Sequence, residues 1–193
     1  MSGIWRMEII GKTFSLHSNS DPEVLAMFPD PLHPAIVHLP IALAVLIPVF
    51  AVLAAGLIYK NVLPERSWIL VVGLQALLVL SSWIAVETGE YDEEIVESVV
   101  AEDLIEGHEE GAERFLLLTG VGLLAMGAGL LPLQLGTRGR LMGVVTSMAV
   151  LASAATVGHS GGELVYRHGA ANAYISDLAP EAENASPSTR HDD

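Results

Sequence analysis

Histidines are the residues of this chain with the widest range of chemistry, and five of the seven lie near the ends of apolar stretches. These five are His33, His38, His108, His159 and His168. A neutral imidazole can bind a metal ion or a haem iron. The carboxylates near the histidines supply oxygen ligands of the kind that zinc, iron or copper accept. Those in the best positions are Glu87, Glu113 and Glu163.

Composition excludes several kinds of chemistry. The chain contains no cysteine, so it has no disulfides, thiolate zinc sites, iron–sulfur clusters or covalently attached c-type haem. Any cofactor must be held by His, carboxylate or Met side chains. The formal net charge of −14 argues against a nucleic-acid partner, because the phosphate backbone is itself an anion.

Three interpretations of the histidine cluster are open. The first is non-covalent b-type haem between two imidazoles from different helices, with His38 paired to His108 or to His159. The second is a His and carboxylate metal site, although the sequence has no tight ligand spacing such as HExxH. The third is structural, with each histidine bonded to a carbonyl or carboxylate that locks the helices together. His38 is expected to be the most buried histidine, because its helical neighbours are apolar.

The elements that must position these residues are membrane helices. Of the 193 residues, 51% are hydrophobic and only 17% are charged. Crossing the hydrocarbon core takes about 20 mostly apolar residues in a helix. Four stretches qualify, at about 35–59, 67–86, 115–135 and 141–162. The sequence therefore predicts an all-α fold, an integral membrane four-helix bundle.

The first and third connections between these spans are basic. The first contains Lys60 and Arg66, and the third contains Arg138 and Arg140 in a tight turn expected at residues 136–139. By the positive-inside rule, both connections lie in the cytoplasm. The protein is then expected in the cytoplasmic (inner) membrane of the cell, with both termini on the outer side.

The second connection, residues 87–113, contains about half of the acidic residues of the chain. Apolar residues recur in it at spacings of three and four, which predicts an amphipathic helix that caps the outer end of the bundle. This acidic face could also recruit a basic redox protein or a larger membrane complex.

The sequence also makes predictions for the segments that flank the four spans. Residues 1–30 are expected to lie on the outer side and to include a short helix that begins at Asp21. Residues 31–172 form the membrane domain, and the acidic tail 173–193 is expected to be disordered. Trp68, near the end of a span, is interpreted as an interfacial anchor.

Two motifs resemble those of a bacterial and archaeal family of four-helix membrane proteins known as a domain of unknown function. The opening motif is HPAIVHLPIA at residues 33–42, and the closing motif is GGELVYRHG at residues 161–169. Thr88–Gly89 and His108–Glu109 are similar to weaker landmarks in the middle of the family. The resemblance covers roughly residues 30–172.

The resemblance implies a place in electron transfer, because related domains are joined to Rieske or cytochrome c modules. The family's landmarks fall on His33, His38, His108 and His168, whereas His159 is less clearly part of the pattern. The sequence thus predicts a membrane subunit of an electron-transfer system that holds b-type haem through outer-side histidines. A scaffold subunit without catalysis and a metal-binding membrane protein are the alternatives.

Overall fold

The computed structural model describes residues 8–9, 12–13 and 32–175. The chain divides into two compact units, Met1–Asp30 and Pro31–Asp193. In the first unit, strands β1 (Glu8–Ile9) and β2 (Lys12–Thr13) pair antiparallel. The helix predicted from Asp21 and the tail beyond residue 175 lie outside the described residues.

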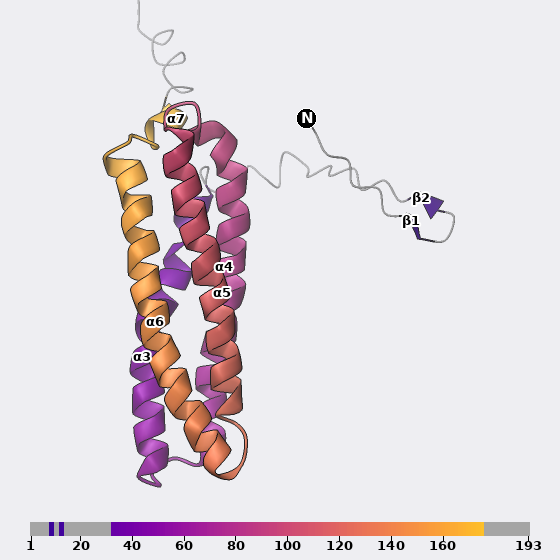
Figure 1. Ribbon diagram of the computed structural model, residues 1–193, viewed down its shortest axis with the longest axis vertical. Helices are drawn as coiled ribbons and strands as arrows, with labels where there is room; N and C mark the ends of the chain where they lie inside the picture. The colour runs from indigo at the N-terminus through magenta and orange to yellow at the C-terminus, as the bar shows by residue number, and fades with distance from the viewer. Residues whose placement is uncertain (1–7, 10–11, 14–31, 176–193) are drawn as a thin grey trace, which may run out of the picture. The chain divides into compact units, whose positions relative to one another are not determined.

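The second unit is a bundle of helices that run side by side (Figure 1). Its elements are α2 (His33–Ile36), α3 (His38–Tyr59), the 3-10 helix η1 (Glu65–Trp68), α4 (Ile69–Val96), α5 (Glu102–Ala128), α6 (Leu133–Tyr166) and α7 (Asn172–Ile175). The four long helices form a ring in which α3 packs on α4 and α6, and α5 packs on α4 and α6.

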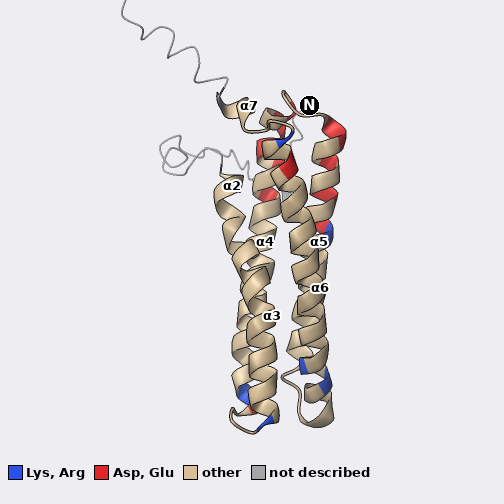
Figure 2. Ribbon diagram, turned by 90° about the vertical axis from the view of Figure 1, so that its left-hand side faces the viewer, with Lys and Arg blue, Asp and Glu red and all other residues tan. Residues whose placement is uncertain are grey.

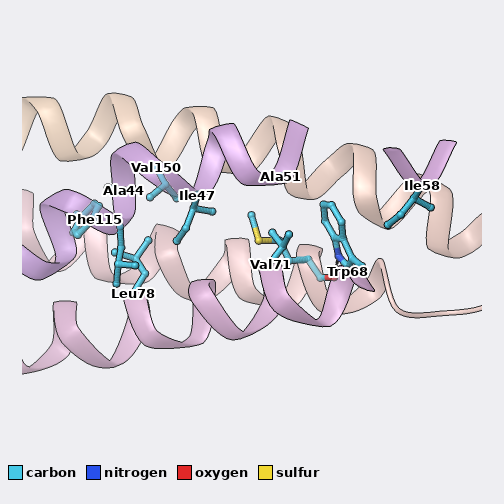
Figure 3. Packing of buried hydrophobic residues seen from close by; sticks show 11 residues of the cluster. Ala44, Ile47, Ala51, Ile58, Trp68, Val71, Leu78, Phe115 and Val150 are labelled. Atoms are coloured by element: carbon cyan, nitrogen blue, oxygen red, sulfur yellow. Dashed lines mark hydrogen bonds between the residues drawn. The ribbon is translucent and has the colours of Figure 1, made fainter. Parts of the chain in front are cut away.

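Four helical stretches of this unit are long and apolar enough to cross a membrane. The interior of the bundle is filled by buried side chains such as Ile47, Val71 and Leu78 (Figure 3). Large apolar side chains also cover the outside, where Leu117 and Leu124 are more than 70% exposed. An exterior of this kind is suited to lipid. The predicted all-α membrane bundle is confirmed.

The charged residues gather at the two ends of the bundle (Figure 2). We call the end with the carboxylates of α4 and α5 the acidic end, and the other end the arginine end. At the arginine end, the turn between α5 and α6 lies at residues 129–132. The prediction of a turn at residues 136–139 is wrong, because Gly136 and Gly139 belong to α6 and let its backbone approach the end of α5.

Two buried side chains join the loops at the arginine end. The Trp68 indole is fully buried and donates a hydrogen bond of 2.8 Å to the Met126 carbonyl, so its interpretation as an interfacial anchor is wrong. The buried Arg140 guanidinium donates to the Gly129 carbonyl at 3.1 Å and to Glu65 Oε1 at 3.4 Å. Arg140 therefore ties the α5–α6 turn to η1.

The acidic connection also differs from its prediction. It does not form a separate cap helix: α4 continues to Val96, α5 begins at Glu102, and only residues 97–101 turn between them. The apolar residues of this segment instead lie on the outermost turns of the two long helices and on the turn. There Val100 and Ile105 pack against Ala170, in the stretch that joins α6 to α7.

Candidate functional site

A cavity of about 490 Å³ lies at the acidic end of the bundle. Its walls come from α2, α4, α5, α6 and the stretch that leads into α7, and they are mostly apolar. Cavities of this size and character are typical of sites for small molecules and cofactors. Two of the predicted histidines line it, His33 from α2 and His108 from α5.

The His33 ring is held in one orientation by α4. Its Nδ1 lies 2.8 Å from the Ala85 carbonyl oxygen and 3.3 Å from Thr88 Oγ1. A carbonyl can only accept, so Nδ1 carries the proton and Nε2 keeps a free lone pair. The backbone N–H of His33 also donates to Asp92 Oδ2 at 3.4 Å, which fixes the start of α2 on α4.

The His108 ring is held in the same way by α6. Its Nδ1 lies 2.8 Å from Ser160 Oγ. The Ser160 hydroxyl donates its own proton to the Val157 carbonyl at 3.0 Å, so its oxygen accepts from the His108 ring. His108 Nε2 is therefore also unprotonated, and both histidines have the tautomer that leaves Nε2 available as a ligand.

Each ring lies close to a glycine of a neighbouring helix. A Cβ at Gly89 would come within 3.2 Å of His33 Cε1, and a Cβ at Gly161 within 3.0 Å of His108 Cε1. These distances are shorter than ordinary van der Waals contact. The two glycines thus allow the rings to lie where they do.

The charge state of both rings follows from their position beyond the apolar spans but inside the bundle. Burial lowers the pKa of His33, although its bond to Ala85 and the charge of Asp92 partly oppose that effect. Burial also lowers the pKa of His108, and the nearby His33 lowers it further. Both imidazoles are therefore neutral at pH 7, which is the form that binds a metal.

Carboxylates line the same cavity. They are Glu90, Asp92, Glu93, Glu109 and Glu113, and among the described residues no Lys or Arg lines it with them. Oε1 of Glu109 is buried and has no hydrogen-bond partner within the described part of the chain. Burial and the neighbouring Glu93 raise the pKa of Glu109 to about 7.

This raised pKa predicts a stability that depends on pH. The folded protein binds a proton at Glu109 more tightly than the unfolded chain does, so the stabilisation is lost as the pH rises toward 7. We expect Glu109→Gln to raise the melting temperature at pH 8 and to leave it unchanged at pH 4. Circular dichroism in detergent measures this difference. The exposed Glu110, which pairs with Arg114, is the matched control: Glu110→Gln should show no such gain at pH 8.

The other predicted histidines do not line the cavity. His38 is exposed at the start of α3, with Nδ1 3.3 Å from the Ala35 carbonyl. The expectation that it is the most buried histidine is wrong, and it does not line the cavity with His108. The His159 side chain is 75% exposed on α6 and lies 3.6 Å from Glu163. His168 is exposed just after α6.

The carboxylates proposed as metal ligands are also dispersed. Glu163 pairs with Arg167 on the outer face of α6, and Glu87 accepts a bond of 3.0 Å from the Trp83 indole. Glu113 lines the cavity but is exposed. Among the residues that the structure describes, no three His, Asp or Glu side chains are grouped as ligands of a metal ion. The predicted ligand set is not assembled there.

Sequence reasoning missed Ser160, which orients the His108 ring, and Asp92, which accepts from the backbone N–H of His33. Ser160 and Asp92 carry no signal of their own, because a serine in an apolar helix and an aspartate in an acidic run are common. Gly89 and Gly161 did carry a signal, since both belong to the motifs at residues 88–89 and 161–169. Those glycines face the histidines of the other motifs.

Comparison with known proteins gives one match. No curated protein and no solved structure matches the chain significantly. Residues 29–174 match a family described as "Predicted membrane protein (DUF2231)". The match covers the whole bundle, including all four apolar helices and both histidines of the cavity. The chain belongs to the predicted membrane protein family DUF2231.

Proposed function

We propose that this protein is a membrane subunit of an electron-transfer system that holds b-type haem between His33 and His108. One observation carries the proposal: two histidines from different helices line one apolar cavity, and the Nδ1 of each is held so that Nε2 is free. Histidines that ligate metals almost always donate their other ring N–H in this way. The proposal replaces His38 with His33.

The residues of the cavity fit such a group in three respects. Its two imidazoles are neutral, its remaining wall is mostly apolar, and glycines stand behind both rings. Neutral imidazoles and apolar walls are what bis-histidine haem requires. When bound, haem supplies a centre that takes up and releases one electron.

The acidic end favours a basic electron donor. The positive-inside rule orients the arginine end toward the cytoplasm, which puts the acidic end and the cavity on the outer side of the membrane. Carboxylates of α4 and α5 surround that end (Figure 2). A donor with a basic surface would be steered to it, so its association is expected to weaken as salt is added.

The test is an absorption spectrum of the protein purified in mild detergent from haem-replete cells. We expect a Soret band and sharp reduced α and β bands, and we expect His33→Ala and His108→Ala to abolish both. The matched controls are His38→Ala and His159→Ala, because these two exposed histidines should leave the spectrum unchanged.

Two results would contradict the proposal. A folded protein that stays colourless under haem-replete conditions would leave the scaffold alternative, or a metal site if metal analysis finds an ion. A haem spectrum that survives loss of both His33 and His108 but vanishes in His38→Ala would place the haem elsewhere on the bundle.

A further inference from the structure

We propose that a water molecule is bound inside the bundle at Gln75 of α4, far from both ends of the helices. Gln75 lies about midway along the apolar stretch 67–86, and its side chain is fully buried. Its Oε1 is also buried and has no hydrogen-bond partner within the described part of the chain. This inference goes beyond the proposed function and does not depend on it, because Gln75 does not line the cavity of His33 and His108.

The nitrogen of the same amide is held by α5. Gln75 Nε2 donates a hydrogen bond of 2.8 Å to the Thr119 carbonyl oxygen. A carbonyl only accepts, so the atom at this position must be the nitrogen and not the oxygen. Inverting the amide would lose this bond and bring two acceptors together. The orientation of the amide is therefore fixed, and Oε1 is the atom that lacks a partner.

The hydroxyls of the bundle interior do not supply a donor to Gln75 Oε1. Each of them donates its proton to a carbonyl of its own helix, over 2.7–3.1 Å. Among the described residues, the buried hydroxyls are those of Ser81, Ser82, Thr119 and Ser147. Their oxygens keep lone pairs, so the interior has further acceptors but no proton to give.

Water is the donor that fits this position. No bulk solvent reaches a polar group in the hydrocarbon core, and a carbonyl left without a donor there carries the full cost of its desolvation. Ordered waters in protein interiors bind to buried groups of this kind. The backbone of α5 leaves space beside the amide, since a Cβ at Gly122 would lie 2.9 Å from Gln75 Nε2.

The composition allows a direct test by NMR on the native chain. Gln75 and Gln134 are its only glutamines, so isotope-labelled glutamine gives two side-chain amide signals. In deuterated detergent, we expect the Gln75 amide protons to show a cross-peak to water that changes sign between laboratory-frame and rotating-frame NOE spectra. A bound water gives this change of sign, whereas chemical exchange does not. Gln134 is exposed and is the internal reference, which should show exchange alone.

Two matched glycine variants locate the water. Gly122→Ala should reduce the Gln75 cross-peak by at least about half, because the added Cβ overpacks the site and displaces the amide. Gly120→Ala is the control and should leave the cross-peak unchanged, since nothing lies within 4 Å of its added Cβ.

Three results would overturn the proposal. The first is a native protein whose Gln75 amide shows no such cross-peak, and the second is a cross-peak that Gly122→Ala leaves unchanged. The third comes from Thr119→Val, which removes the hydroxyl of the residue that Gln75 bonds to. The cross-peak should persist in this variant, and its loss would assign the signal to the Thr119 hydroxyl proton.

Discussion

Gly139→Ala should lower the free energy of unfolding by about 3 kcal/mol, the upper part of the range for overpacked cores. A Cβ at Gly139 would lie 2.4 Å from the carbonyl carbon of Ala128 and 2.4 Å from the Gly129 nitrogen. Both are backbone atoms, so no side-chain rotation relieves the clash. The α5–α6 turn would have to move as a whole. Unfolding by sodium dodecyl sulfate in mixed micelles, followed by circular dichroism, measures the loss.

The same substitution elsewhere in α6 provides the control. Gly158 has nothing within 4 Å of the position a Cβ would take. Gly158→Ala should therefore be neutral or stabilise the helix by about 0.5–1 kcal/mol, because alanine loses less backbone entropy than glycine. Equal stabilities for the two variants would show that α6 does not approach the end of α5 closely at Gly139.

Trp68→Ala should cost about 3–5 kcal/mol, as expected for a fully buried aromatic residue. The indole is completely buried, and both Gly129 and Gly143 lack a Cβ where one would contact it. Removing the ring leaves a void and frees the Met126 carbonyl. The same unfolding assay measures the effect, and Trp68→Phe should lose less because it keeps most of the packing.

Trp83 is the matched tryptophan for this prediction. Trp83 lies on α4, is 53% exposed, and donates its indole N–H to the exposed Glu87. Trp83→Ala should change the free energy of unfolding by no more than about 0.5 kcal/mol, as is usual at a surface. A Trp83→Ala loss as large as that of Trp68→Ala would mean that Trp83 also packs inside the bundle.

The number and rough position of the membrane helices could be predicted from the sequence. Lipid imposes a minimum length of apolar helix, and four stretches exceed it without a charge. The turn at residues 129–132 was not predicted because Leu130 and Leu131 continue the apolar stretch. The turn was instead predicted at Gly136 and Gly139, because glycines are common in turns. Glycine marks either a turn or a close backbone approach, and only the fold shows which.

The direction in which each histidine points could not be predicted. In a helix of a soluble protein, the apolar face is the side that packs against the core. In this protein the side of a helix that faces lipid is as apolar as the side that faces the interior. The apolar neighbours of His38 are such a case: Ile41 and Val45 are about half exposed. Charged residues indicate better than apolar ones which side of a helix faces the interior. His108 and Glu109 lie in the part of α5 that is still amphipathic.

The length of the helices affects how this protein responds to bilayers of different thickness. In α5, residues 102–114 precede the charge-free stretch, and at 1.5 Å per residue they extend about 20 Å. The hydrocarbon core is about 30 Å thick, a distance that about 20 helical residues cross, so we expect residues 102–114 to extend beyond it. Hydrophobic mismatch in a thinner or thicker bilayer is therefore expected to act first on the lipid-facing leucines of the charge-free stretches.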